Sequence, residues 1–592
     1  MLAGEGVDVV IHSTHEAGLK IGGIGAVLDG LLSAKAYLRN VRRTILTGPF
    51  DSQDSTTMER LRSPRNALTV LYSSLDGVSA EEAPSEELRQ IERQYRVHIL
   101  YGKRRFDRAE HEVILVDPAE ADLKHVNGLK HRLWERFGLQ SDRYEHSYEY
   151  EYYVRAAEPQ YLALEAVLGS DVNRGRKVVM AHEFMGVPLC LVAELFRPRA
   201  FCRVYYAHEV PPVRPVIEEH PGHDTMFYNV LRLAQSEFLT FPQVFGDQSS
   251  FFKYALLEAA GDFAAMFAVG DLVVEELRFL GSRFATKTID LVYNGIPTPQ
   301  ASPAEKLQSL GRLRTYADNL LDLHPDYVFT HVARLVPSKG LWRDLRVLEE
   351  LDPLLASREA TAVLFILATA PPSGRRSEDI LRMEEEYGWP VSHREGHPDL
   401  VGPEVSLYHA IEQFNARARA VRVVFVNQFG WDQERCGRRM PSDMSFADLR
   451  VGSDLEFGQS IYEPFGIAQF EPLPYGALCV VSSSCGCVGF AKRTGIDMGS
   501  NVIVADYISL PPQLQVSSWR EAFQIGQETR DVVERYRASE AALAIDAALP
   551  RSDDQRAHLM QRGHRLASRM SWEVVVSEYM LPALARALHT TG

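Results

Sequence analysis

The fold is indicated first by Ser460-Ile461-Tyr462-Glu463-Pro464-Phe465-Gly466-Ile467-Ala468-Gln469-Phe470-Glu471, a stretch in which two carboxylates lie eight positions apart. A short strand ending at Phe457 precedes it, and Pro464 suits the first turn of a helix, where its missing N–H costs nothing. A helix beginning there would place Glu471 just over two turns along, on nearly the same face as Glu463. Its first amides would meet an anion such as phosphate, while Glu463 accepts hydrogen bonds from hydroxyls. The stretch therefore predicts a site for a polyol phosphate.

An apolar strand and a turn of small residues follow, at residues 479–486. A carboxylate pair alone would also fit a solvated helix face. Together with the strand and turn, it resembles the donor-sugar motif of retaining glycosyltransferases that have two facing Rossmann-like domains, the GT-B fold. The resemblance implies that Glu463 holds sugar hydroxyls and that Glu471 holds the ribose or a neighbouring group. It also implies that Phe465, Gly466 and Ile467 line the donor site.

A glycine-rich loop follows the first strand of the chain, residues 7–11. Lys20, Gly22 and Gly23 in this loop resemble the K-x-G-G element of glycogen and starch synthases, which faces the donor diphosphate and the transferred sugar. Glycines at such a position let the backbone approach a ligand. A strand-to-helix turn that binds nothing is the alternative.

Two cations follow a strand in the second half of the chain. Arg334 ends the strand that begins at Tyr327, and Lys339 lies in its exit loop, which gives the pattern R-x4-K. In the resembled family these two cations hold the nucleotide phosphates as the sugar departs. Fixed cations lower the barrier selectively where charge grows on a leaving group, and a planar Arg complements a compact Lys.

Two further apolar strands end in histidine, at His182-Glu183-Phe184 and at His208-Glu209. Ligands of open parallel sheets bind beyond the carboxyl ends of the strands, so we expect both histidines at one edge. The first resembles the family's His-Asp/Glu-Trp element, with Phe184 in place of the indole, and implies that His182 and Glu183 contact sugar or acceptor. His208 matches the histidine close to the transferred sugar, although the residues after it depart from the family pattern. Neither histidine has a third ligand at a metal-binding spacing, and we expect no metal.

Two departures concern the subfamily. Ser484-Cys485-Gly486-Cys487 stands where bacterial glycogen synthases carry Thr-Gly-Gly, and Glu471 is present although those enzymes often lack the second carboxylate. Glucan phosphorylases share the architecture, but no lysine here lies in a matching pyridoxal-phosphate motif.

Composition indicates a globular protein of two large domains: 592 residues, 45% hydrophobic and 24% charged. A net charge of −15 disfavours binding to nucleic acid or to an anionic membrane surface. Six cysteines without a C-x-x-C pair favour a reducing compartment. The first residues do not form a signal peptide and no window reaches the length of a membrane span, so we expect a cytoplasmic protein.

Strands alternate with helices in both halves, which predicts an α/β fold of two doubly wound parallel sheets facing each other across an inter-domain cleft. We divide the chain into residues 1–300 (acceptor side, with the K-x-G-G loop), 301–570 (nucleotide-sugar site) and 571–592 (a helix that either returns to the first domain or packs on its own). Residues 81–108 are charged and read as a peripheral insertion. The predicted strands are residues 41–46, 113–116, 178–181, 204–206, 263–269 and 289–292, and then 362–368, 422–426, 454–457, 477–481 and 501–504.

The resemblance implies transfer of glucose, with retention, from a nucleoside diphosphate donor to a glucan hydroxyl, His208, Arg334, Lys339 and Glu463 being the catalytic residues. Lys20, Gly22 and Gly23 would close over the phosphates, and no cofactor or metal is needed because cations and amides neutralise the charge. A small-molecule or sugar-phosphate acceptor fits the same motifs. A non-catalytic protein that binds nucleotide sugar or glucan is a third reading. ADP-glucose and UDP-glucose fit equally well as donors, and the oligomeric state stays open.

Overall fold

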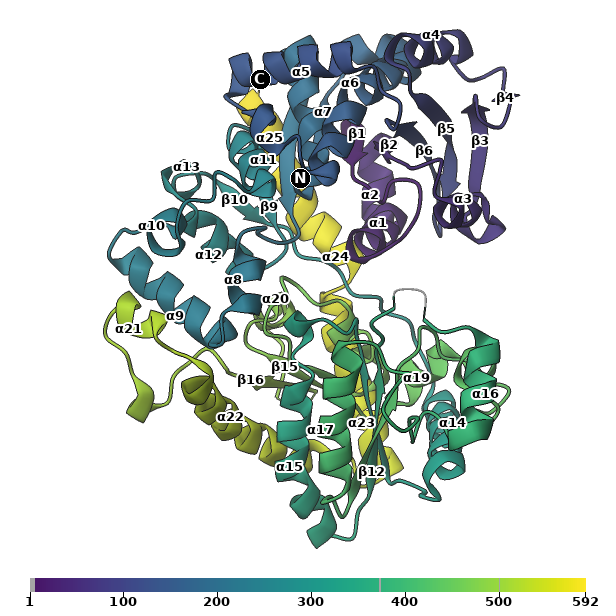
Figure 1. Cartoon of the computed structure of the whole chain (residues 1–592), viewed down its shortest axis with the longest axis vertical. Helices are drawn as coiled ribbons and strands as arrows, with labels where there is room; N and C mark the ends of the chain where they lie inside the picture. Colours follow the sequence, from purple (N-terminus) through teal and green to yellow (C-terminus); the bar gives the residue numbers. More distant parts are fainter. Residues whose placement is uncertain (1–5, 372–373, 500, 592) are drawn as a thin grey trace. The chain divides into compact units, whose positions relative to one another are not determined.

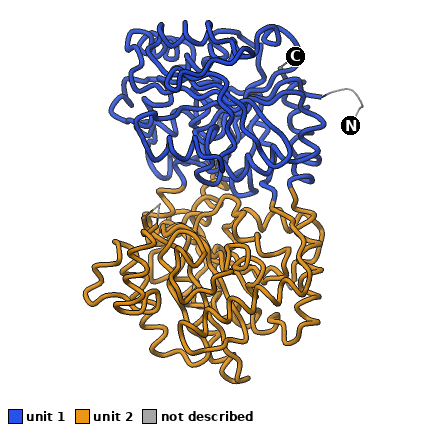
Figure 2. The backbone as a smooth tube through the Cα atoms, turned by 90° about the vertical axis from the view of Figure 1, so that its right-hand side faces the viewer, with its two compact units in different colours: residues 1–213, 239–295, 572–592 blue, residues 214–238, 296–571 orange. Residues whose placement is uncertain are grey.

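The structure is a computed structural model that describes residues 6–371, 374–499 and 501–591 (Figure 1). The chain forms two compact units (Figure 2). Unit 1 comprises Met1–Val213, Leu239–Gly295 and Trp572–Gly592, and unit 2 comprises Arg214–Phe238 and Ile296–Ser571. The predicted division at residue 300 lies near the junction of Gly295 and Ile296. The assignment of Arg214–Phe238 to unit 2 had no counterpart among the sequence predictions.

Unit 1 contains a ten-stranded sheet in the order β10-β9-β8-β7-β1-β2-β6-β5-β3-β4. Seven strands are parallel: β1 (Val7–Ser13), β2 (Val41–Pro49), β6 (Glu110–Asp117), β7 (Lys177–His182), β8 (Cys202–Ala207), β9 (Ala265–Ala268) and β10 (Ile289–Leu291). The main helices of this unit are α1 (Gly23–Ser33), α2 (Lys35–Asn40), α5 (Leu123–Phe137), α6 (Tyr148–Leu168), α7 (Glu183–Phe196), α11 (Phe252–Ala260) and α12 (Asp271–Phe279). Each parallel strand was predicted from its apolar run.

The remaining strands extend this sheet with antiparallel pairs, which the sequence predictions did not include. They are β3 (Leu68–Ser73), β4 (Val78–Ser79) and β5 (His98–Arg105). Residues 81–108 were read as a peripheral insertion, but they contain α4 (Ser85–Tyr95) and the whole of β5. The strand β5 was not predicted because it ends in three basic residues, Lys103, Arg104 and Arg105. Its apolar run, Ile99–Leu100, is short, although the sheet buries it.

Unit 2 contains a six-stranded, fully parallel sheet in the order β13-β12-β11-β14-β15-β16. The strands are β11 (Tyr327–Val332), β12 (Ala362–Leu367), β13 (Val421–Val426), β14 (Leu455–Gly458), β15 (Leu478–Ser482) and β16 (Val502–Ala505), each close to its predicted range. The main helices are α14 (Pro303–Leu321), α15 (Trp342–Ser357), α17 (Pro403–Asn415), α19 (Phe446–Gly452), α20 (Gly486–Arg493), α22 (Gln527–Ala548) and α23 (Asp553–Arg569).

Helices cover both faces of the unit 2 sheet, as the alternating side chains of β12 show. Leu364 and Ile366 pack in a core with residues of α15, α17 and α22. Val363 and Phe365 pack in a second core with α14 and α19. A strand buried on both faces reads as a continuous apolar run, which is why β12 was predicted without alternation.

The Arg214–Phe238 segment contains α9 (His223–Ser236) and all of α8 (Val213–Glu219) except its first residue, and a buried arginine joins it to unit 2. Arg343 has no exposed side-chain surface. Its guanidinium contacts Asp224 of α9 at 2.6 Å and Glu534 of α22 at 2.9 Å, and lies 4.0 Å from the ring centre of Tyr507. Burial would lower the pKa of Arg343, but the two carboxylates outweigh it and raise that pKa. The cation therefore stays charged and ties α9 to the core of unit 2.

The last residues of the chain pack in unit 1. The Trp572 ring lies against two glycines, since a Cβ at Gly30 or Gly295 would come within 2.6 Å of it. A π-helical turn, Val575–Met580, precedes Pro582 in α25 (Leu581–Thr591). The wider turn accommodates a proline that lacks an N–H. Among the described residues, no helix is long and apolar enough to cross a membrane.

Candidate active site

The two principal motifs of unit 2 meet at the edge of its sheet. β11 is flanked by β12 on one side and β14 on the other, so the strand order reverses there, and ligands of such sheets bind outside the strand ends at this point. Lys339 follows β11 and Glu463 follows β14. Their side chains form an ion pair in which Lys339 Nζ donates to Glu463 Oε2. The fold therefore brings together a cation and a carboxylate that were predicted from separate motifs.

Backbone contacts lock these two loops against each other. The Ile461 amide donates to the Ser338 carbonyl at 2.8 Å. Gly340 has φ +60°, and a Cβ there would lie 2.5 Å from the Gln459 carbonyl oxygen. Glycine at this position thus allows the Lys339 loop to approach the segment that leads to Glu463.

Glu463 is largely buried and stays ionised. Burial alone would raise its pKa, but the charge and hydrogen bond of Lys339 outweigh burial and hold that pKa below the usual range. Gln469 Nε2 also donates to Glu463, at 3.2 Å, and the charge of Arg214 acts in the same direction.

Arg214 is a functional candidate that the sequence reasoning missed. Its guanidinium lies 5.1 Å from the ring centre of Tyr462, and its Nη1 donates to Ser338 Oγ at 3.4 Å. A signal was present: Arg214 follows the His208 motif within a few residues, but its place in the sequence suggested unit 1.

The prediction of a helix that begins at Pro464 is wrong. Only two short 3₁₀ turns follow, Ala468–Phe470 and Leu473–Tyr475. Gly466 has φ +90°, which is not helical, and Pro472 and Pro474 each lack the N–H that an α-helix needs.

Free amides nevertheless occur where the prediction placed them. The N–H groups of Gly466, Ile467 and Ala468 make no hydrogen bond to any residue that the structure describes. Three successive unpaired donors suit an oxyanion.

The other predicted donor residues of unit 2 lie around this centre. Glu471 Oε2 contacts Arg450 Nη2 at 2.8 Å, and Arg450 Nη1 contacts Glu456 at 3.0 Å, so Glu471 already has a cationic partner. The Arg334 side chain is exposed and, within residues 6–371, 374–499 and 501–591, has no hydrogen-bond or ion-pair partner. It is therefore available to an anionic ligand.

The turn that replaces Thr-Gly-Gly serves the Glu463 segment. The amides of Gly486 and Cys487 donate to the carbonyls of Glu463 and Phe465 at 3.0 and 2.8 Å. A Cβ at Gly486 would lie 1.8 Å from the Pro464 carbonyl oxygen. These first amides of α20 are occupied, and the turn positions the Glu463 backbone.

In unit 1 the K-x-G-G loop is held by a residue that the sequence reasoning did not single out. Glu16 Oε2 accepts hydrogen bonds from the amides of Ile21 and Gly22, at 2.6 and 2.5 Å. Lys20 is half exposed and contacts Asp29 at 3.0 Å. Gly23 begins α1, and a Cβ there would meet nothing within 4 Å. The loop is thus preformed by a buried carboxylate.

Three histidines lie side by side at the ends of β1, β7 and β8. His12 Nδ1 is 2.9 Å from His182 Nε2, and His182 Nδ1 is 2.9 Å from His208 Nε2. Burial lowers the pKa of all three, to about 3 for His208, so the rings are neutral. His12 was missed because a single polar residue in an apolar strand has no local signature.

Glu183 is buried beside them in a left-handed backbone conformation, φ +64°. Its Oε1 accepts hydrogen bonds from the amides of His208 and Glu209, and Tyr205 Oη donates to its Oε2 at 3.1 Å. The Glu183 side chain therefore holds the turn that carries His208. Direct contact of His182 or Glu183 with sugar stays a prediction.

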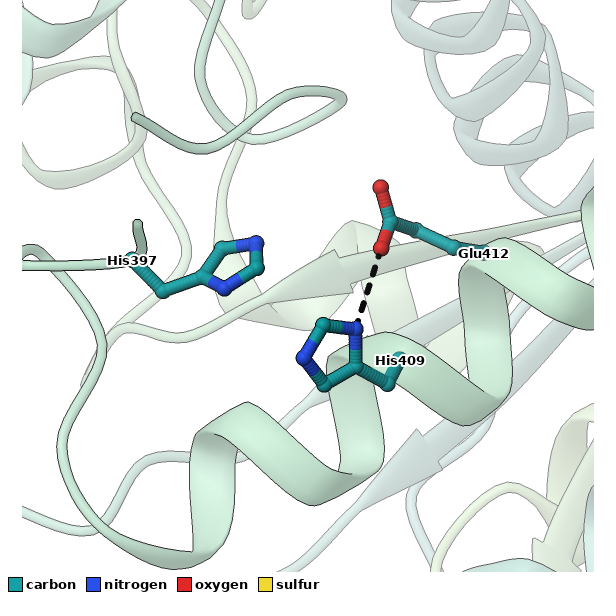
Figure 3. Close-up of side chains that lie close together, drawn as sticks. All are labelled: His397, His409 and Glu412. Atoms are coloured by element: carbon teal, nitrogen blue, oxygen red, sulfur yellow. Dashed lines mark ion pairs between the residues drawn. The ribbon is translucent and has the colours of Figure 1, made fainter. Parts of the chain in front are cut away.

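One group in the described residues could offer three ligand atoms to a metal ion: His397, His409 and Glu412 (Figure 3). His409 Nδ1 lies 3.3 Å from Glu412 Oε2 on α17. Structural zinc sites use four ligands, whereas this group offers three and is largely exposed. It lies apart from the Lys339 and Glu463 loops in sequence.

Comparison with known proteins identifies the fold. No protein-family model and no curated protein matches the sequence. Among solved structures, the catalytic domain of starch synthase IV from Arabidopsis thaliana, bound to ADP and acarbose, aligns with 99% of this chain and 100% of that chain, at 14% identity and a TM-score of 0.50. Sucrose-phosphate synthase from Thermosynechococcus elongatus aligns with 99% of this chain and 100% of that chain (11% identity, TM-score 0.48). A UDP-forming α,α-trehalose-phosphate synthase from Burkholderia vietnamiensis covers 98% of each (12% identity, TM-score 0.48).

At such identities a structural likeness establishes architecture alone. The two Rossmann-like units and the alignment with starch synthase IV over nearly the whole chain agree with the predicted fold class, and the protein has the GT-B fold.

Proposed function

We propose that this protein is a retaining glycosyltransferase that moves glucose from ADP-glucose or UDP-glucose to a growing α-glucan, as glycogen and starch synthases do. The observation that carries the proposal is the Lys339–Glu463 pair at the switch point of the unit 2 sheet. A cation and an ionised carboxylate at that place suit a ligand that has both a diphosphate and hydroxyl groups.

The leaving diphosphate gains negative charge as the sugar departs. Lys339, Arg334 and the free amides of Gly466 to Ala468 would stabilise that charge, which is greater in the transition state than in the bound donor. Lys339 would share its charge between the diphosphate and Glu463. The carboxylate of Glu463 would then accept hydrogen bonds from sugar hydroxyls.

The remaining residues have supporting roles in this proposal. Glu471, fixed by Arg450, would bind the ribose or a neighbouring group. His208 would contact the sugar near the reacting carbon. Lys20, Gly22 and Gly23 would close over the phosphates, and the acceptor would attack on the face from which the diphosphate leaves.

The test is release of nucleoside diphosphate from ADP-, UDP- and GDP-sugars, each with glycogen, maltose, a sugar phosphate or no acceptor. Release that glycogen stimulates with one glucose donor supports the synthase. Release that only the sugar phosphate stimulates would move the acceptor to a small molecule. Donor binding without release under every condition would indicate a binding protein.

A matched pair of variants tests the site. We expect Lys339→Ala to lower kcat/KM by about 100- to 1,000-fold, the cost of removing one donor to a developing anion. The exposed Lys124→Ala should turn over normally. Normal turnover in Lys339→Ala, with native melting behaviour, would overturn the assignment, and the same holds for Glu463→Ala.

A further inference from the structure

Unit 1 contains a chain of hydrogen bonds that runs from its interior to His208. Thr44 Oγ1 lies 3.0 Å from Tyr37 Oη, and Tyr37 Oη lies 3.0 Å from His12 Nε2. From His12 the chain continues through His182 to His208 at 2.9 Å per step. Thr44, Tyr37, His12 and His182 are all buried, and His208 is partly exposed.

A neutral imidazole has one N–H and one lone pair, so every ring in the chain must donate on one side and accept on the other. The chain therefore has only two self-consistent arrangements. Either all donors are directed toward His208, or all are directed toward Thr44. The rings share one tautomer in each arrangement, Nδ1–H in the first and Nε2–H in the second.

The buried end of the chain distinguishes the two. In the arrangement directed toward His208, the Thr44 hydroxyl donates to Tyr37 Oη and Tyr37 donates to His12 Nε2. Every buried donor then has an acceptor. When the rings donate toward Tyr37, one buried hydroxyl is left without an acceptor: that of Thr44 if Tyr37 donates to Thr44 Oγ1, or that of Tyr37 if Thr44 donates to Tyr37 Oη. Thr44 Oγ1 makes no other hydrogen bond to a residue that the structure describes. A buried donor without a partner costs about 1–3 kcal/mol, so the first arrangement is favoured.

We propose that Thr44, Tyr37, His12 and His182 are positioning residues that fix His208 as a neutral Nδ1–H tautomer, which donates a hydrogen bond to an oxygen of the transferred sugar. The second half of this statement rests on the function proposed above; the tautomer does not. His208 Nδ1 makes no hydrogen bond to a described residue and is therefore available to a ligand.

The neutral state suits the chemistry. Glycosyl transfer develops positive charge on the sugar, as in an oxocarbenium ion. A protonated imidazole beside it would repel that charge, whereas a neutral N–H binds a sugar oxygen without doing so. Burial of the three rings supports this, because it lowers the pKa of each.

The tautomers can be measured without substrate. In the full chain labelled with ¹⁵N-histidine, long-range proton–nitrogen correlation at pH 7 reports which ring nitrogen carries hydrogen, and His12→Gln, His182→Gln and His208→Gln assign the signals. We expect protonated Nδ1 and unprotonated Nε2 in all three rings. Protonated Nε2 in any of them overturns the proposal. Because no donor is needed, this result stands whether or not the protein turns over a nucleotide sugar.

Coupling along the chain has a matched control. Tyr37 and Tyr150 are both fully buried, and each hydroxyl bonds to one other hydroxyl, Thr44 at 3.0 Å and Ser141 at 2.7 Å. Tyr37→Phe should shift the ring nitrogen signals of His182 and His208 and lower kcat by about five-fold, the effect of one neutral hydrogen bond. Tyr150→Phe should do neither.

Signals that change in His12 alone would refute the coupling. If Tyr37→Phe does not fold, Thr44→Val replaces it. That variant removes only the first donor, so all three rings should keep the Nδ1–H tautomer. A switch to Nε2–H in Thr44→Val would contradict the proposed direction.

Discussion

The ends of the parallel strands carry different chemistry in the two units. In unit 2, the loops after β11 and β14 carry full charges. Lys339 and Glu463 pair with each other, Glu471 pairs with Arg450 of α19, and the Arg334 side chain has no ion-pair partner among the described residues. In unit 1, the ends of β1, β7 and β8 carry neutral imidazoles joined by hydrogen bonds. Both sets lie at or next to the point where the strand order of their sheet reverses.

The difference shows two ways of keeping polar groups at a largely buried site. A charge removed from water needs an opposite charge, so unit 2 contains ion pairs whose members depend on each other. A neutral ring needs only one donor and one acceptor, so unit 1 can build a chain of any length, provided that its direction is consistent. The ion pairs of unit 2 prepare a site for an anion. The neutral histidines of unit 1 supply hydrogen bonds without a net charge.

The largest expected effect comes from breaking the most buried charge of unit 2. Arg343→Met leaves Asp224 and Glu534 without their cation, and we expect a loss of about 3–5 kcal/mol in the free energy of unfolding. Arg376→Met is the control, since Arg376 is 79% exposed and pairs with Asp379 in its own helix turn. Chemical denaturation measures both. An Arg343 variant as stable as the control would show that this charge is not needed for stability.

A smaller effect is expected from separating the two loops of unit 2. Gly340→Ala places a Cβ 2.5 Å from the Gln459 carbonyl and forces alanine into a left-handed conformation, at a cost of about 1–3 kcal/mol. Turnover should fall with stability because Lys339 moves away from Glu463. Gly311→Ala, in α14 with nothing within 4 Å, should instead stabilise by up to about 1 kcal/mol. Equal melting temperatures for the two variants would refute the locking role of Gly340.

The neutral histidines predict an acid-sensitive unit 1. Their pKa values are lower in the folded state than the 6.5 of an exposed histidine, so below pH 6.5 the unfolded chain binds more protons. Stability is complete above pH 6.5 and falls toward pH 3, by about 1.4 kcal/mol per pH unit for each excess proton. Glu183 and Glu258, whose pKa values burial raises, act in the opposite direction, whereas burial also lowers the pKa of His15 and His111 in the same unit.

The contribution of Glu463 to stability changes in a different pH range. Its pKa lies below 4.5, so the stability that it contributes is lost only as the pH falls below that value. Burial also lowers the pKa of His220, His223 and His393 in unit 2, but not as far as in the three-histidine chain. Hydrogen exchange of β1 and β7 peptides, corrected for intrinsic rates and compared with β12, should therefore show greater loosening of unit 1 than of unit 2 between pH 6.5 and 5. Equal protection of the two units over that range would contradict the neutral histidine chain.

Most of the fold could be predicted from the sequence because the parallel strands are continuous apolar runs. β12 and β7 need no knowledge of their neighbours to be recognised. β5 was missed because its last three residues are basic, and the helix at Pro464 was predicted wrongly because Pro472 and Pro474 were not weighed against Pro464. Both errors arose where two local sequence signals within a few residues predict different structures.

Part of the site was beyond the reach of sequence. Lys339 and Glu463 were named from their motifs, but their ion pair depends on β11 and β14 being neighbours. His12, Arg214 and Glu16 carry no motif, and each gains its partners only through folding. A sequence motif identifies residues that bind a ligand. It identifies the residues that hold them in place less readily.

The division of the chain between the units also affects how the protein can be cut. The polypeptide passes from one unit to the other four times, after Val213, Phe238, Gly295 and Ser571. A recombinant fragment that starts at Ile296 would carry most of unit 2 but not α9, and Arg343 would lose Asp224. During synthesis, α9 leaves the ribosome long before α15 and α22 and must wait for its partners. Expression of the second half as an independent module would therefore require Arg214–Phe238 to be grafted onto it by a new linker.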